Sequence, residues 1–332
     1  MFLHERTGAA ALKSLATAGR RVADPARVFA VMDHIVDTRA GRGDATTMVG
    51  GSAFITETRA AALTAGITLF DVTDSDQGIT HVISPELGIV LPGVTLVAPD
   101  SHTCTQGAFG AFAWGIGSSE AEHAMATGTL RMARPRTMRV CFDNALRPGV
   151  TAKDMALTLI ARHGSAGGQG FVVEFAGAAV RALDMEARMT LCNMSIEAGA
   201  RAGLVAPDEK TFEYLKGRPQ APKNEAWKKA VSAWKLLPSD SDAAYDRELH
   251  INAADVRATV SYGTHPGMVV ALNAPVPAAK GLQERRALEY MQVAAGKSML
   301  GMQVDLVFLG SCTNSRISDL RVAADLLRDR KI

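Results

Sequence analysis

Three clusters of polar residues each follow an apolar, β-branched run of the sequence, where a strand would end. They are Asp33-His34, Asp100-Ser101-His102-Thr103, and Gly-Ser-Cys-Thr-Asn-Ser-Arg at 310–316. In open α/β sheets, ligands bind in the crevice beyond the carboxyl ends of the strands. A helix that begins there also offers free backbone N–H groups to an anion. The three clusters are therefore the first candidates for a ligand site.

The two Asp–His clusters contain the residue types that acid–base chemistry needs. A single Asp beside a His at a strand end is often a structural hydrogen-bonded pair. Two such pairs on separate strands favour a function, because acid–base catalysis needs a proton donor and an acceptor in differently tuned environments. His81 is a further candidate, although a lone histidine near a helix start is more often a satisfied structural residue.

Cys312 has two interpretations that its spacing leaves open. A single cysteine in a strand is usually a small buried hydrophobic residue. At a turn before a helix its thiolate would be stabilised, which suits a nucleophile or a metal ligand. No C-x-x-C or His-rich companion is present to decide between them. G-x-S-x-G and P-loop motifs are absent, and Gly115-Ile116-Gly117 lacks the third glycine of a dinucleotide fingerprint.

Short β-branched runs alternate with amphipathic stretches along the chain, which predicts an α/β fold. The predicted strands are Val28–Met32, Thr68–Val72, Val94–Ala98, Met138–Phe142, Phe171–Phe175 and Val304–Leu309. The predicted helices are Glu57–Ala65, Ser119–Leu130, Lys153–Arg162, Glu186–Ala198, Leu282–Ala295 and Ile317–Arg330. Between them, residues 210–246 predict a surface helix and loops, in which Trp227 and Trp234 pack.

Composition narrows the class of protein. The 332 residues are 47% hydrophobic and 21% charged, as in a globular protein of two or three domains. The net charge of +2 gives no support to nucleic-acid or membrane-surface binding, and no apolar run is long enough to span a bilayer. The four cysteines are widely and irregularly spaced, so we expect free thiols and a cytoplasmic protein.

Three longer motifs, in order along the chain, resemble one known family. They are the run from Pro99 to His123 (Pro-Asp-Ser-His-Thr-Cys-Thr-Gln-Gly-Ala-Phe-Gly onward), Asn-Met-Ser-Ile-Glu-Ala-Gly-Ala-Arg at 193–201, and the run at 310–316. Together they resemble the aconitase superfamily and, within it, the large subunits of isopropylmalate isomerases. The resemblance implies three-layer α/β/α domains at residues 1–136 and 137–272. It also implies an incomplete third domain at 273–332, which we expect to be less protected from hydrogen exchange than the first.

The resemblance implies a [4Fe–4S] cluster with three cysteine ligands. One iron is left open as a Lewis acid, so that water leaves the substrate and returns at the neighbouring carbon. Cys312 matches the first ligand, and the other two belong to a Cys-x-x-Cys that is expected further downstream. We therefore expect this chain by itself to hold no stable cluster and to be inactive.

The resemblance also assigns roles by position. Asp33 and His34 match a pair that protonates the leaving hydroxyl. The other catalytic matches are His81, Asp100, His102 and Glu197. The substrate-binding matches are His4, Ser101, Asn193 and Asn314, and His4-Glu5 resembles a substrate-contacting strand end of the family.

In this family the catalytic base is a serine on a swivelling domain, which in the isomerases is usually a separate small subunit. We therefore expect a small-subunit partner that also carries the loop selecting the substrate. Two residues depart from the family pattern, since Gln106 replaces an expected His and His265 an expected Asn or Ser. Both departures bear on the substrate more than on the reaction.

The implied reaction is the interconversion of 2- and 3-isopropylmalate in leucine biosynthesis. Alternatives within the family are hydro-lyases acting on homocitrate, methylmalate or dimethylmalate. A cluster-free RNA-binding relative is an alternative of another class, which the near-neutral charge disfavours. A folded but inactive gene product is a third, which the retained acid–base residues disfavour.

Overall fold

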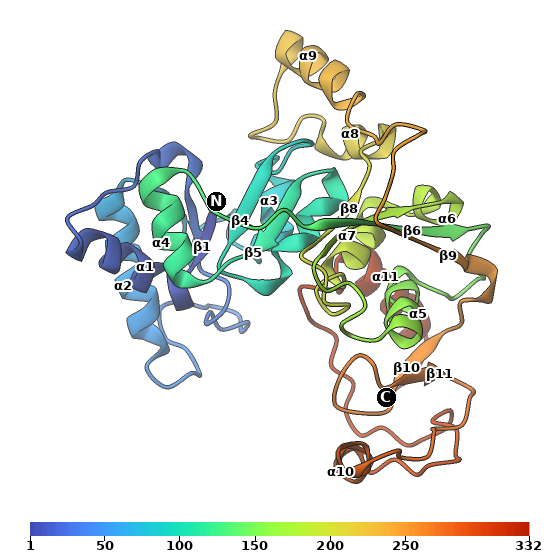
Figure 1. Ribbon diagram of the computed structural model, residues 1–332. Helices are drawn as coiled ribbons and strands as arrows, with labels where there is room; N and C mark the ends of the chain where they lie inside the picture. Colours follow the sequence, from blue (N-terminus) through green and yellow to red (C-terminus); the bar gives the residue numbers. More distant parts are fainter. Residues whose placement is uncertain (332) are drawn as a thin grey trace. The chain divides into compact units, whose positions relative to one another are not determined.

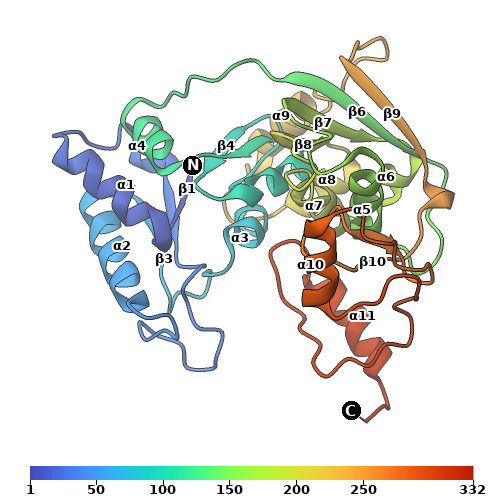
Figure 2. The same ribbon diagram turned by 60° about the horizontal axis from the view of Figure 1, so that its bottom comes forward.

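We describe the protein from a computed structural model, which defines residues 1–331. By contact, the chain divides into two compact units (Figures 1 and 2). Unit 1 comprises residues 1–134 and 207–237, and unit 2 comprises residues 135–206 and the chain from 238 onward. The predicted division into three domains stays a prediction.

Unit 1 is built on two small parallel sheets. The first has the order β1-β2-β3, with β1 at Phe2–His4, β2 at Phe29–Val31 and β3 at Thr68–Phe70. The second pairs β4 (Thr95–Ala98) with β5 (Phe112–Gly115). Within the first sheet His4 lies opposite Val31. Because the strands are parallel, the residues that follow β1 and β2 meet at one edge of the sheet.

Unit 1 also contains helices, several of which pack through a face of recurring apolar residues. The helices are α1 (Glu5–Thr17), α2 (Gly51–Ala65), α3 (Thr80–Glu86), α4 (Ser118–Thr127), α8 (Glu209–Leu215) and α9 (Asn224–Trp234), with 3-10 turns η1 (Pro25–Arg27) and η2 (Ser101–Phe109). In α1, buried Gly8, Ala11, Leu12 and Leu15 form such a face. Helix α2 ends at Gly66, whose φ of 66° is the left-handed value that favours glycine.

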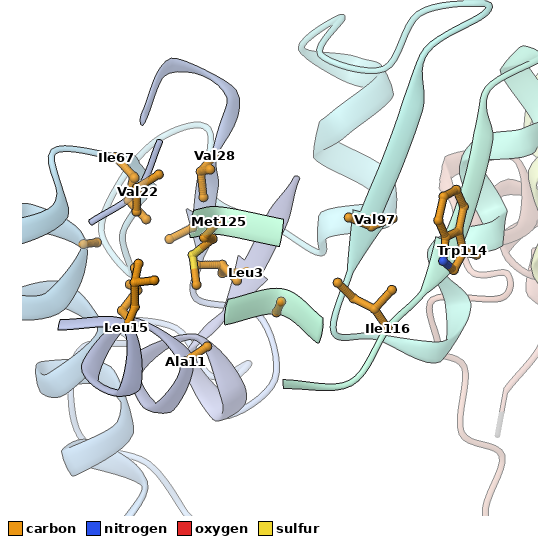
Figure 3. Close-up of a cluster of buried hydrophobic side chains, with 14 residues drawn as sticks. Leu3, Ala11, Leu15, Val22, Val28, Ile67, Val97, Trp114, Ile116 and Met125 are labelled. Carbon is orange, nitrogen blue, oxygen red and sulfur yellow. The ribbon is translucent and has the colours of Figure 1, made fainter. Parts of the chain in front are cut away.

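A hydrophobic core holds unit 1 together (Figure 3). Leu15 on α1 and Met125 on α4 lie with Val28 beside β2, and Val97 and Trp114 extend the core to β4 and β5. All five side chains are at most 8% exposed. Burial of side chains of this size supplies most of the stabilisation of such a unit, at roughly 1.5–3 kcal/mol for each large one.

Unit 2 contains a four-stranded parallel sheet with the order β8-β7-β6-β9. Its strands are β6 (Arg136–Asp143), β7 (Phe171–Ala176), β8 (Ala202–Val205) and β9 (Arg247–Asn252). Its helices are α5 (Ala152–His163), α6 (Ala178–Ala182), α7 (Met185–Asn193), α10 (Leu282–Met291) and α11 (Ile317–Leu327), with η3 at Ala253–Asp255. A separate antiparallel pair joins β10 (Thr259–Ser261) to β11 (Val269–Ala271).

Most of the predicted elements are confirmed, and one is wrong. Five of the six predicted strands are present as β2, β3, β4, β6 and β7. Val304–Leu309 is not a strand: its five apolar side chains are 54–84% exposed, and it pairs with no strand among residues 1–331. An apolar β-branched run forms a strand only where a neighbouring strand and a packed face complete it.

Smaller differences concern helix ends and the N-terminus. The predicted Ser119–Leu130 helix stops at Thr127, because Gly128 adopts a φ of 67°. The predicted Glu186–Ala198 helix ends at Asn193 and continues as turns. Strand β1 ends at His4, where the resemblance implied a strand end, whereas helix α1 was not predicted. The packing role of the Trp pair is confirmed, since the rings of Trp227 and Trp234 meet edge to face at 5.4 Å.

No helix in the part of the chain that the structure describes combines the length and the apolar character needed to cross a bilayer.

Candidate functional site

The imidazole of His34 lies between two carboxylates of unit 1. Strand β2 ends at Val31, and Asp33 and His34 follow it. The ring nitrogen Nδ1 of His34 is 2.6 Å from Oδ1 of Asp33, and its Nε2 is 3.2 Å from Oδ2 of Asp100. Both ring nitrogens therefore face an acceptor. A neutral imidazole carries only one N–H, so this arrangement favours the doubly protonated cation.

The charge of His34 follows from this geometry. Burial lowers its pKa, but the hydrogen bonds to Asp100 and Asp33 more than offset that effect and raise the pKa to about 10. For Asp100, burial raises the pKa, but the hydrogen bonds from His34 and His81 hold it well below its usual range. At neutral pH the site therefore contains an imidazolium beside an ionised carboxylate.

Asp100 also holds two other predicted residues. His81, in the first turn of α3, has its side chain 1% exposed and its Nε2 3.2 Å from Oδ1 of Asp100. The backbone N–H of His102 donates to the same Oδ1 over 2.7 Å, so Asp100 caps the start of η2. Ser101 lies at that start, with its Oγ 3.3 Å from Nδ1 of His102. The single carboxylate of Asp100 thus organises both histidines and the first turn of η2.

His4, the last residue of β1, lies against His34. The two rings stack with centroids 3.8 Å apart and planes 17° from parallel. Burial, and then the charge of His34, lower the pKa of His4. Its Nε2 is 2.9 Å from the carbonyl oxygen of Pro99, which can only accept, so Nε2 carries the proton. Nδ1 is buried and has no hydrogen-bond partner among residues 1–331. It is therefore a bare acceptor.

Sequence reasoning did not identify three residues that hold the turn after β2. The carboxylate of Glu5 accepts the backbone N–H groups of Asp33, His34 and Ile35. Asp33 Oδ2 accepts from Thr80 N over 2.8 Å and from Thr80 Oγ1 over 2.9 Å, and the Gln77 amide donates to the carbonyl of Met32. The only sequence signal was the position of Glu5 directly after His4.

This cluster resembles a metal site in composition but not in bonding. Ligand atoms of His4, Glu5, Asp33 and His34 lie within 4.8 Å of one another. However, the oxygens of Glu5 already accept three N–H groups, and both nitrogens of His34 face carboxylates. The donors that surround Glu5 would repel a cation. We therefore interpret the group as a hydrogen-bonded acid–base cluster.

The Cys312 turn forms a second group, in unit 2, and packs against α7. The Asn193 amide is 3.9 Å from Sγ of Cys312, and Oγ1 of Thr190 donates to the carbonyl of Thr313 over 2.9 Å. Arg316 donates from Nη1 to the carbonyl of Thr313 over 3.0 Å and from Nη2 to that of Cys312 over 3.3 Å. The turn leads directly into α11, as predicted.

Further polar contacts fix the two ends of this turn. Glu186 on α7 accepts from the N–H of Ser318 over 3.0 Å and from its hydroxyl. Lys153 on α5 donates to Oδ1 of Asn314 over 3.2 Å. Glu197 lies four residues after Asn193 in the turn that follows α7, and is partly buried. Asn193, Cys312 and Asn314 are thus joined into one group through the turn.

The expected [4Fe–4S] cluster can be tested against the thiols present. None of the four cysteines is in a disulfide; Cys312 is partly exposed, whereas Cys104, Cys141 and Cys192 are buried. Within residues 1–331, the group of four in unit 1 is the one set of three or more His, Cys, Asp or Glu placed to share an ion, and it contains no cysteine. The described residues therefore do not by themselves fit a cluster that needs three thiolates.

Comparisons with known proteins agree with the motifs. The sequence pattern of the Aconitase family (aconitate hydratase) matches residues 1–332. The 3-isopropylmalate dehydratase large subunit 1 of Bradyrhizobium diazoefficiens is 47% identical over 337 residues, which cover 99% of this chain and 70% of that protein. The 3-isopropylmalate dehydratase large subunit of Roseiflexus castenholzii is 47% identical over 340 residues, covering 99% of this chain and 72% of that protein. The resemblance and the α/β fold class are confirmed, and the chain belongs to the aconitase family.

Proposed function

We propose that this chain is a large subunit of a hydro-lyase that interconverts 2- and 3-isopropylmalate by removing and re-adding water. Two relatives that are 47% identical over nearly the whole chain carry the name 3-isopropylmalate dehydratase large subunit. That name implies a small subunit as the partner. Four cysteines without a disulfide suit the cytoplasm, where we expect this step of leucine biosynthesis to occur.

The observation that carries the proposal is the imidazole of His34 held between Asp33 and Asp100. In the dehydration, a C–H proton goes to a base, the C–O bond breaks, and the leaving hydroxide needs a proton. His34 donates that proton and becomes a neutral imidazole; rehydration reverses the transfer. Since water has a pKa of about 15.7, an imidazolium with a pKa of about 10 still protonates hydroxide favourably.

The neighbours of His34 have supporting roles in this proposal. His4, whose ring stacks on that of His34, lies next to the proton donor and helps to bind the substrate there. Asp100 and the buried His81 keep the donor charged and oriented. Ser101 and His102, at the start of η2, contact the substrate. We assign the base that takes the C–H proton to the small subunit, as in related isomerases.

In unit 2 we propose that Cys312 supplies one thiolate ligand, with Asn193, Asn314 and Glu197 contacting the ligand bound there. A bound [4Fe–4S] cluster would supply a Lewis acid for the substrate hydroxyl and carboxylate. It would need two thiolates beyond the one that residues 1–331 bring to this turn.

A turnover assay tests the proposal. A complete large subunit that contains these residues and two further cluster-ligating cysteines is combined anaerobically with the small subunit of a 3-isopropylmalate dehydratase, iron and sulfide, and the conversion of 3- to 2-isopropylmalate is followed by mass spectrometry. We expect turnover that His34→Gln abolishes and that His123→Gln, at an exposed histidine of α4, leaves unchanged.

The other outcomes separate the alternatives. Turnover of homocitrate, methylmalate or dimethylmalate but not isopropylmalate would move the proposal to another hydro-lyase. Salt-sensitive RNA binding without any turnover would contradict it.

A further inference from the structure

Glu5 is a fully buried carboxylate beside the acid–base cluster of unit 1. It is 0% exposed and is the first residue of α1, directly after β1. Because β1 and β2 are parallel and His4 lies opposite Val31, Glu5 comes next to the turn by which the chain leaves β2. A buried carboxylate is costly unless its oxygens are hydrogen-bonded.

Three successive backbone N–H groups satisfy that requirement. Oε2 of Glu5 accepts from the N–H of Asp33 over 3.0 Å, and Oε1 accepts from the N–H of His34 over 2.6 Å. The N–H of Ile35 donates to Oε1 as well. Consecutive N–H groups that converge on one point form a concave site for an anion. Here a side chain of the same unit supplies the anion.

We propose that Glu5 is the positioning residue of the acid–base cluster, since its carboxylate fixes the turn in which Asp33 and His34 face Asp100. The geometric part of this inference is independent of the substrate, whereas its effect on turnover rests on the proposed function. Glu5 acts through the backbone and touches no reacting atom.

Length and charge of the side chain both matter for this role. Gln keeps the shape of Glu, but its NH₂ group would face backbone N–H donors, so one oxygen must satisfy all three. Asp keeps the charge but is shorter by one methylene and cannot reach all three N–H groups. A role in positioning therefore predicts that both variants disturb the placement of His34. A purely electrostatic role predicts that only Glu5→Gln affects His34.

The titration of His34 reports the geometry of the turn. The charged or titratable groups that face His34 are Asp33, Asp100 and the stacked ring of His4, with His81 reached through Asp100 and Glu5 through the backbone. If the turn shifts, the ring moves away from one or both carboxylates. Its protonation midpoint then falls towards that of an isolated histidine.

The test compares Glu5→Gln and Glu5→Asp with Thr58→Val. The buried Oγ1 of Thr58 donates to the backbone carbonyl of Glu5 over 3.2 Å, so its loss weakens the same helix start but leaves the carboxylate in place. The midpoint of the His34 imidazole is measured by NMR and Tm is measured in parallel. We expect both Glu5 variants to lower the midpoint by at least about one pH unit, and Thr58→Val to lower Tm alone.

A lowered Tm with an unchanged His34 midpoint in both Glu5 variants would overturn the proposal, as would a shift in Glu5→Gln alone. If the variants do not fold, hydrogen exchange in the unchanged chain tests whether Glu5 holds the turn. The N–H groups of Asp33 and His34 should then exchange far more slowly than those of the exposed Gly41 and Ala45; equal rates would overturn the proposal.

These outcomes are independent of the proposed function, because the titration needs no turnover. Where isopropylmalate is turned over, Glu5→Asp should lower kcat more than it changes KM, since the substrate contacts remain. A shifted titration in a chain that turns over no hydro-lyase substrate would uphold the positioning role and contradict the proposed function.

Discussion

The acid–base cluster of unit 1 and the Cys312 turn of unit 2 both contain side chains suited to chemistry. They differ in the contacts that fix the backbone around them. His34 follows a buried strand, and its turn is fixed by Glu5, Gln77 and Thr80. The Cys312 turn follows an exposed apolar segment and is held by polar contacts from α5 and α7. A paired strand fixes the backbone that leads into the His34 turn, whereas no paired strand precedes the Cys312 turn among residues 1–331.

This difference has a consequence for dynamics. Parallel strands with buried side chains open only when much of the unit opens, but a segment without backbone partners exchanges locally. We therefore expect unit 1 to hold a preorganised site. The Cys312 turn should depend on what covers residues 304–309.

The largest expected effect that tests this comparison is in hydrogen exchange. The N–H groups of β2 should exchange at least about 1,000-fold more slowly than those of residues 302–310, which have no strand partner within the described residues. Exchange measured by mass spectrometry after peptic digestion gives both rates in one sample. Similar protection of the two segments would show that the contrast is wrong.

Asp100→Asn should have the next largest effect. The variant removes the charge that holds both His34 and His81, and its NH₂ group faces one of the two rings. We expect turnover to fall by about 100-fold or more, the usual size of a lost acid–base contribution.

Asp143→Asn is a matched control for this variant, because Asp143 forms an exposed ion pair with His250 at 3.0 Å in unit 2. Turnover should be unchanged in the control. Equal losses in the two variants would contradict the special role of Asp100.

A smaller effect should appear in the pH dependence of stability. The pKa of His34 is about 10 in the folded chain and 6.5 for an ordinary histidine, so folding takes up a proton. The resulting stabilisation is complete below about pH 6.5 and is lost as pH rises through about 10. Because the side chain of His34 is 32% exposed, solvent screening reduces this stabilisation of the folded state to about 2 kcal/mol.

Chemical denaturation at pH 6, 8 and 9.5 measures this contribution. His34→Gln should flatten the loss of stability over that range. Identical pH profiles for the variant and the unchanged chain would refute the raised pKa.

The smallest effect concerns the Cys312 turn. Glu186→Ala removes the acceptor of the N–H and hydroxyl of Ser318 at the start of α11. We expect local destabilisation of about 1 kcal/mol and a few-fold faster alkylation of Cys312. Glu289→Ala, at an exposed position of α10, is the control and should leave the alkylation rate unchanged.

The sequence predicted the strand-end positions of Asp33, His34 and Asp100 because apolar runs and polar ends are local patterns. It also predicted the turn of Cys312 before a helix. It did not predict that Val304–Leu309 would stay exposed, because strand formation depends on a partner that a local pattern cannot reveal.

The supporting residues escaped prediction for a related reason. Thr80 and Gln77 are ordinary residues in the sequence, and their contacts to Asp33 and to Met32 span more than 40 positions. Glu5 is an acid in the first turn of a helix, where acids are common. Only its place beside the neighbouring strand reveals its three N–H partners.

The central claim is that Asp33 and Asp100 keep His34 protonated in the folded chain. An NMR titration of ring-labelled histidine, with His34 assigned through His34→Gln, tests it most directly. We predict that His34 remains an imidazolium at pH 8 and titrates near 10. A midpoint near 6.5, the ordinary value for histidine, would contradict the account.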